Sequence, residues 1–142
     1  LLIDDEEDIR DCIRLLVART GNFHIDQASN GEEGLSKILA GNYDCVVSDI
    51  KMPGMDGVSM LKKIRAAGKH LPILFISAFA DDDFDYQVTD YGAVKLINKV
   101  DIKNVGARIN EALKIGRDVQ EITANHEFGL DFLNMLNNGN HK

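Results

Sequence analysis

Five side chains that could bind a cation or a phosphoryl group follow short apolar runs in the sequence, where strands of a sheet would end. They are Asp4, Asp5, Asp49, Ser77 and Lys99. Right-handed crossovers bring the carboxyl ends of parallel strands to one edge of an open sheet, which is the edge where ligands bind. We therefore expect these five side chains to converge.

Carboxylates at Asp4, Asp5 and Asp49 would repel one another unless a divalent cation lay among them. Mg²⁺ suits such hard oxygen ligands, because it takes few ligands from the protein and keeps several waters. With Mg²⁺ and Lys99 neutralising charge, one carboxylate could accept a phosphoryl group as an acyl phosphate, a reaction that needs positioning and electrostatics more than a strong base.

Each of these residues also has an ordinary structural explanation. A lone Asp at a strand end is usually a cap, a lone Lys is usually solvated, and a lone Ser is usually a turn former. We prefer the functional interpretation because chemically compatible groups follow four different strands.

Alternating strand and helix patterns would position these groups. We expect strands at Leu1–Asp5, at Phe23–Ser29, around Val46 and Val47, at Pro72–Ser77 and at Ala93–Lys99. Helical spacing of apolar residues predicts the intervening helices, with N-caps at Asn30 and Asp56 and stops at Gly21, Gly41, Gly68 and Gly92. This alternation predicts βαβ units on a parallel sheet, and hence a three-layer α/β domain.

The bulk composition excludes several classes of protein. A chain of 142 residues suffices for one domain that folds without disulfides, and we expect Cys12 and Cys45 to be reduced core residues, which fits a reducing cytosol. A net charge of −7 disfavours nucleic acid and anionic membranes as direct partners. No apolar run approaches the roughly 18 residues of a spanning helix and no signal peptide is visible, so we expect a cytoplasmic protein. Because the chain starts inside an apolar run and without methionine, we expect its first strand to begin upstream.

Several short motifs follow one another along the chain. They are Asp4-Asp5-Glu6, Asp49-Ile-Lys-Met-Pro-Gly-Met-Asp-Gly57, Ser77-Ala78, Gly92-Ala93 and Lys99. Through these motifs, residues 1 to 118 resemble the response-regulator receiver domains of two-component signalling. The resemblance implies a flavodoxin-like, doubly wound, five-stranded parallel sheet of order 2-1-3-4-5 with helices on both faces.

The resemblance also implies a role for each candidate residue. Asp49 would be the phosphoacceptor, and Mg²⁺ would be held by Asp4, Asp5, Asp49 and the backbone carbonyl of Lys51. Ser77 would contact the phosphoryl group and Lys99 would pair with it. A sensor histidine kinase or a phosphotransfer protein would donate the group, and an unknown downstream protein would respond to it. A receiver domain catalyses only its own phosphorylation and dephosphorylation.

Residues 119 to 142 are expected to form a C-terminal extension beyond the receiver domain. The apolar stripe from Ile102 to Ile122 is longer than a helix needs to cover strands of about 17 to 20 Å. Phe128, Phe132, Met135 and Leu136 then repeat at helical spacing. This second stripe predicts an added amphipathic helix that packs on the domain or on a second copy of the chain, as in a homodimer; the alternative is a frayed terminus.

Two positions differ from the family's usual pattern. Leu96 replaces a Tyr or Phe, and Val100 replaces a proline that follows the lysine through a cis bond. A cis bond before a non-proline residue costs about 2.5 to 4 kcal/mol, so we expect a trans bond between Lys99 and Val100. These departures favour, as an alternative, a receiver-like scaffold that binds partners without being phosphorylated. The other alternative is a Mg²⁺-dependent phosphohydrolase with an aspartate nucleophile, although Lys51 stands where such an enzyme normally has a second acid.

Overall fold

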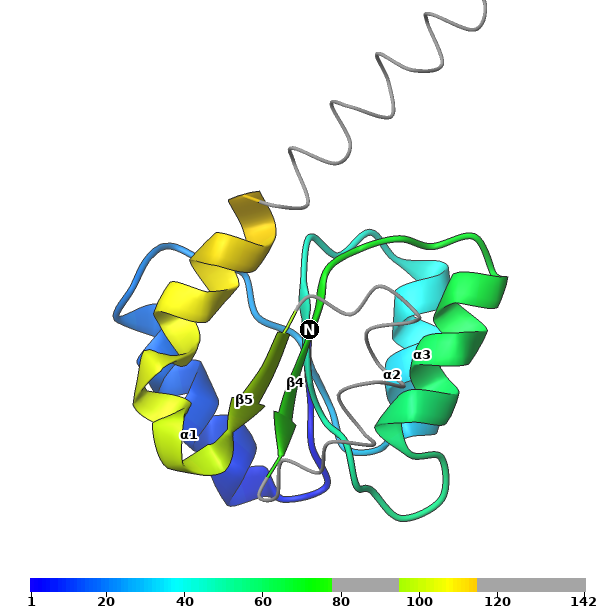
Figure 1. Ribbon diagram of the computed structural model, residues 1–142, viewed down its shortest axis with the longest axis horizontal. Coiled ribbons are helices and arrows are strands. Elements are labelled where there is room, and N and C mark those ends of the chain that lie inside the picture. The colour runs from blue at the N-terminus through cyan, green and yellow to red at the C-terminus, as the bar shows by residue number, and fades with distance from the viewer. Residues whose placement is uncertain (78–94, 115–142) are drawn as a thin grey trace, which may run out of the picture.

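The computed structural model describes residues 1–77 and 95–114, with side chains described for residues 1–76 and 102–114 (Figure 1). Strands and helices alternate along the chain. The elements are β1 (Leu2–Ile3), α1 (Glu7–Ala18), β2 (Gln27–Ala28), α2 (Gly31–Ala40), β3 (Val46–Asp49), α3 (Gly57–Ala66), β4 (Ile73–Ser77), β5 (Lys95–Asn98) and the 3₁₀ helix η1 (Lys99–Asn104). Residues 105–114 are α-helical.

The strands form one sheet of order β2-β1-β3-β4-β5, and every pair of neighbours is parallel. This result confirms the predicted α/β architecture and the predicted order of the first four strands. β3 lies at the centre, with β1 on one side and β4 on the other. The predicted C-terminal extension and the predicted helix that ends near Gly92 lie outside the described residues.

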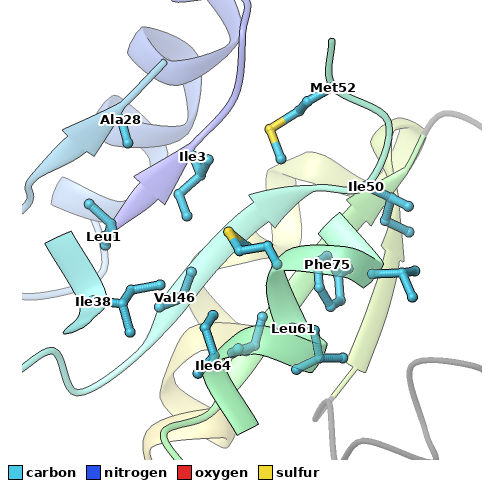
Figure 2. Close-up of a cluster of buried hydrophobic side chains, with 13 residues drawn as sticks. Leu1, Ile3, Ala28, Ile38, Val46, Ile50, Met52, Leu61, Ile64 and Phe75 are labelled. Atoms are coloured by element: carbon cyan, nitrogen blue, oxygen red, sulfur yellow. The ribbon is translucent and has the colours of Figure 1, made fainter. Parts of the chain in front are cut away.

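The two faces of the sheet carry separate hydrophobic cores. Because successive strand residues point to opposite faces, Val46 packs on one side of β3 and Val47 on the other. The face toward α2 and α3 is shown in Figure 2, and its largest side chain is the fully buried Phe75. On the opposite face, Ile13 and Val17 of α1 meet Val105 and Ile109 of the helix at 105–114. A strand buried on both faces is typical of a parallel sheet.

Both predicted helix N-caps are confirmed. The side chain of Asn30 accepts a hydrogen bond from Glu33 N at 2.7 Å, and the side chain of Asp56 accepts one from Ser59 N at 2.8 Å. These bonds satisfy backbone donors that the first turn of a helix leaves without a partner. α2 and α3 therefore begin where the sequence predicts.

The predicted strand at Phe23–Ser29 is wrong in length, because only Gln27 and Ala28 form β2. A ladder needs a partner at each position, and β1 pairs with β2 only through Leu2 and Ile3. Upstream of β2, Phe23 and Ile25 are partly buried against the core without strand geometry.

The backbone described here contains no cis peptide bond, which agrees with the trans bond expected after Lys99.

Cys12 is exposed, so its assignment to the core was wrong. The buried stripe of α1 is centred on Ile13 and Val17, which are each 3% exposed. Successive residues of an α-helix are about 100° apart around its axis, so Cys12 lies beside this stripe and faces solvent. Cys45 is half-buried next to β3, and both thiols are free.

Within the described ranges, no helix has the length and apolar character needed to cross a membrane.

The cysteines should differ in reactivity. Burial raises the pKa of the Cys45 thiol to about 11, and only the thiolate is a good nucleophile. At pH 8 we expect Cys45 to react with iodoacetamide about 100-fold more slowly than it does in the denatured chain. The exposed Cys12 should react at nearly the same rate in both states. Peptide mass spectrometry over time measures both rates. Equal protection of the two thiols would contradict the burial of Cys45 and the exposure of Cys12.

A tight contact between α2 and β1 gives a second prediction. A Cβ atom added to Gly34 would overlap Ile3 Cδ1, which lies in the core. We expect Gly34→Ala to lower the free energy of unfolding by about 1 to 3 kcal/mol through overpacking, although alanine is the better helix former. Ser36→Ala, at an exposed position of the same helix, should change it by less than about 0.5 kcal/mol. Urea unfolding measures both; a Gly34→Ala protein as stable as its parent would show that Ile3 repacks freely.

Candidate functional site

Three carboxylates meet at the carboxyl edge of the sheet. Asp49 is the last residue of β3, and Asp4 and Asp5 directly follow β1, the strand next to it. The register pairs Ile3 with Ser48, so the chain places Asp4 beside Asp49 as the two strands end. One oxygen atom from each of Asp4, Asp5 and Asp49 lies within 4.8 Å of the others. The structure therefore brings together the three acids that the sequence singles out.

The three carboxylates differ in exposure. Asp4 is 2% exposed and Asp49 is 8% exposed, whereas Asp5 faces solvent. Backbone amides hold the buried pair: Ile50 N donates to Asp49 Oδ1 at 2.8 Å, and Glu6 N donates to Asp4 Oδ1 at 2.9 Å. A hydrogen bond from a backbone amide holds a carboxylate in one rotamer. The buried acids are thus oriented, and Asp5 forms the solvent side of the cluster.

Arg10 of α1 supports the turn that carries Asp4. Its Nη1 donates to the backbone carbonyl of Asp4 at 2.6 Å, and its Nε donates to Gln27 Oε1 of β2 at 3.1 Å. The guanidinium therefore links α1, β2 and the end of β1. The motifs and the apolar patterns of the sequence do not single out Arg10. The available signal was a single basic residue among the acids that open α1.

The loop between β3 and α3 is anchored on both sides of Lys51. Ile50 is 1% exposed and Met52 is 7% exposed, so the exposed Lys51 lies between two buried neighbours. Gly57 N donates to the Ile50 carbonyl at 2.7 Å, which closes the loop. A Cβ atom on Gly57 would lie 2.7 Å from a ring carbon of Phe75 and 2.9 Å from the Asp49 carbonyl oxygen. Only glycine fits there, and the Lys51 backbone is thereby held close to Asp49.

Ser77 and Lys99 lie at the same edge of the sheet by position in the chain. Asp49 pairs with Ile76 in the register of β3 and β4, so Ser77 follows one residue later and ends β4. Ser77 in turn pairs with Asn98 of β5, and Lys99 comes next. Their side chains are not among those described. The backbone thus brings both predicted residues to the edge that carries Asp49.

The donor set fits a small, hard cation. Carboxylate oxygens are the ligands that Mg²⁺ prefers, and they coordinate it at about 2.0 to 2.1 Å. Oxygens already within 4.8 Å of one another need only small side-chain adjustments to share one ion. The exposed side near Asp5 gives waters access, and Mg²⁺ usually keeps several of them. Asp4, Asp5 and Asp49 could therefore hold Mg²⁺.

A groove of about 690 Å³ lies at the opposite edge of the sheet. Residues at the amino ends of β1, β2, β3 and β4 line it, namely Leu1, Asp26, Cys45 and Pro72, together with Phe23 and Ile109. Asp49 lies four positions after Cys45 along β3, a span of about 13 Å at 3.3 Å per residue, and none of Asp4, Asp5 and Asp49 lines the groove. A molecule bound in this groove would not reach the carboxylates, so the groove is not part of the candidate site.

Comparison with known proteins decides the family. The response regulator receiver domain family matches residues 1–110 of the chain. This chain belongs to that family. The receiver domain is similar to the transcriptional regulatory protein DltR of Streptococcus agalactiae, at 38% identity over 99 residues, which are 70% of this chain and 44% of DltR. It is also 39% identical over 82 residues to the transcriptional regulatory protein ResD of Bacillus subtilis, a match that spans 58% of this chain and 33% of ResD. The match thus spans less than half the length of these relatives.

Solved receiver domains have the same fold. The Francisella response regulator 1452 receiver domain is 28% identical, with a TM-score of 0.73 over 80% of this chain and 93% of that one. The response regulator TrrA of Thermotoga maritima, solved in complex with Mg²⁺ and BeF, is 29% identical, with a TM-score of 0.69 over 78% of this chain and 95% of that one. The likeness covers most of each solved domain, so the sheet and the helices on it are those of a receiver domain.

Removal of Asp5 tests the cation site. We expect Asp5→Ala to weaken Mg²⁺ binding by at least roughly tenfold, the lower end of the cost of losing even an outer-shell partner of a metal. Calorimetric titration of the metal-free protein measures this change. Glu7→Ala, which removes an exposed charge from the nearby start of α1, is the matched control and should bind Mg²⁺ almost as the parent does. Equal affinity of Asp5→Ala and the parent would exclude Asp5 as a ligand.

Proposed function

We propose that this receiver domain accepts a phosphoryl group on Asp49 in a two-component phosphorelay. The observation that carries the proposal is the position of Asp49, at the end of the central strand with oxygens of Asp4 and Asp5 within 4.8 Å. Membership of the receiver family supports it further. The donor is a sensor histidine kinase or a phosphotransfer protein, and a downstream protein recognises the phosphorylated form.

The transfer exchanges one bond to phosphorus for another. A carboxylate oxygen of Asp49 attacks the phosphorus atom, a mixed anhydride forms, and the bond from phosphorus to the donor nitrogen or oxygen breaks with its electrons leaving on the donor. When bound, Mg²⁺ neutralises charge on the phosphoryl oxygens during this step. The step as written transfers no proton, so it needs no general base.

The neighbouring residues orient the attacking group and balance its charge. Ile50 N fixes Asp49 Oδ1 by its hydrogen bond of 2.8 Å. Asp4, Asp5 and the backbone carbonyl of Lys51 are the further Mg²⁺ ligands in this proposal. Ser77 and Lys99 end β4 and begin η1 at the same sheet edge, where their hydroxyl and ammonium groups would bind the phosphoryl oxygens.

The signal would pass to other proteins instead of directly to DNA. A net charge of −7 repels a phosphate backbone, so this chain is a poor nucleic-acid ligand by itself. The curated relatives are transcriptional regulators that are much longer than the matched region. We propose a cytoplasmic protein whose phosphorylation changes its contacts with another protein or domain.

A receiver-like scaffold that is never phosphorylated is the second candidate. Leu96 and Val100, which replace the usual aromatic residue and proline, favour it. Leucine carries no hydroxyl and has a smaller side chain than tyrosine, so the usual route from the site to the outer surface is altered. The two candidates differ in whether Asp49 takes up a phosphoryl group.

Incubation with acetyl phosphate and Mg²⁺ separates the candidates. We expect intact-mass spectrometry to show one added phosphoryl group on the parent and none on Asp49→Asn, because the amide is a poor nucleophile. Asp44→Asn makes the same chemical change at an exposed residue before β3 and should label like the parent. Labelling should also disappear when the metal is removed with a chelator. If Asp49→Asn labels as well as the parent, another residue is the acceptor; if the parent does not label, the scaffold is the better description.

A further inference from the structure

The middle of the loop between β3 and α3 is held by a contact from another element of the fold. Its first residues are fixed by the bond from Ile50 N to Asp49 and by the bond from Gly57 N to Ile50. Pro53 and Gly54 are exposed, however, and Met55 is only half-buried, so burial alone does not fix them. Lys51, whose carbonyl is a Mg²⁺ ligand in the proposed function, lies in this same loop. Whatever fixes the middle of the loop therefore also affects the site.

Glu32, in the first turn of α2, makes the contact with this part of the loop. Its Oε1 accepts a hydrogen bond from Met55 N at 2.9 Å, across 23 residues of sequence. The same oxygen would lie 2.8 Å from a Cβ atom on Gly54, a residue whose φ of +80° already favours glycine. The Glu32 carboxylate therefore contacts the turn at Gly54 and Met55 directly.

The backbones of α2 and the loop also touch. A Cβ atom on Gly31 would lie only 2.5 Å from the Met55 carbonyl oxygen, so glycine is needed for this approach. Glu32 thus receives the Met55 amide while Gly31 lets the Met55 carbonyl come close. The first turn of α2 and the loop form one junction, which lies at the carboxyl edge of the sheet together with Asp49.

Capping of α2 does not explain Glu32, because other residues perform that task. Asn30 caps the helix, and Glu33 accepts hydrogen bonds from Ser29 N at 3.0 Å and Ser29 Oγ at 2.8 Å. Glu33 also pairs with Lys37 Nζ at 3.3 Å. Two adjacent acids in one helical turn therefore have different partners: Glu33 stabilises the start of the helix, whereas Glu32 reaches across to the loop.

We propose that Glu32 is a positioning residue for the phosphoacceptor site. By holding Met55 N, it keeps the loop, and with it the Lys51 backbone, at the place that Mg²⁺ binding requires. This inference rests on the proposed function only for its consequence at the metal. The contact itself can be tested in the metal-free protein.

The first measurement is hydrogen exchange at the Met55 amide without metal. We expect Glu32→Ala to speed this exchange about tenfold relative to core amides of α3, since an amide bonded to a charged acceptor loses its partner. Glu32→Gln keeps an oxygen acceptor and should restore the protection. A variant that merely weakens the whole fold would speed the exchange of the α3 core amides to the same degree, and that result would overturn the proposal.

The second measurement is Mg²⁺ affinity by calorimetric titration of the full chain. We expect Glu32→Ala to bind Mg²⁺ about fivefold more weakly than the parent. This loss is smaller than the roughly tenfold or greater loss typical of outer-shell partners of a metal, because the bond between Glu32 and Met55 N is exposed to solvent. Glu32→Gln should bind Mg²⁺ like the parent. Asp44→Ala removes an exposed acid before β3 and should leave both measurements unchanged. Faster exchange at Met55 with unchanged Mg²⁺ affinity would also overturn the positioning role. If Asp49 failed to label in the parent while both measurements changed as expected, the proposed function would be wrong and the role of Glu32 at the cation site would stand.

Discussion

Burial of two carboxylates beside a third is costly, because each loses water and repels the others, and much of this structure serves to hold that charge in place. Asp4 and Asp49 are almost fully buried, and each receives a backbone amide at 2.8 to 2.9 Å. Such bonds offset part of the cost of desolvation but leave like charges close together. A bound cation would relieve that repulsion. Such a cation would be a shared partner for all three carboxylates.

The sheet fixes the distance between these acids. β3 is buried on both faces, so shifts in its register would expose apolar side chains that now fill the two cores. Phe75 on the neighbouring strand packs so closely over Gly57 that no side chain fits there. The hydrophobic cores thus act on the site through the backbone. They hold Asp49 at the end of β3 and make the next loop turn immediately into α3.

The polar contacts around the site come from helices on both sides of the sheet. Arg10 of α1 holds the backbone that carries Asp4, and Glu32 of α2 holds the loop that follows Asp49. Both residues act on backbone atoms, and neither belongs to the group of three acids. A phosphoryl transfer step depends strongly on the position of its charged groups. These two contacts therefore set how firmly the charged residues are held, even though they supply no reactive atom.

The amino-acid sequence by itself determined most local elements and which three carboxylates would lie together. Continuous apolar runs predicted buried strands, Asn30 and Asp56 predicted two helix starts, and the handedness of parallel crossovers predicted that Asp4, Asp5 and Asp49 would meet. These predictions hold because capping, periodicity and chain handedness depend on residues close together in the sequence. The motifs then identified the family, and with it the roles proposed for Ser77 and Lys99.

The tertiary structure decided features that depend on distant partners. The short length of β2 follows from the two positions that β1 offers, and the exposure of Cys12 follows from which side of α1 meets the sheet. The bond between Glu32 and Met55 joins residues 23 positions apart, and nothing in either local sequence requires it. Local patterns fix what each segment can form, whereas packing between segments fixes which neighbours a polar side chain finds.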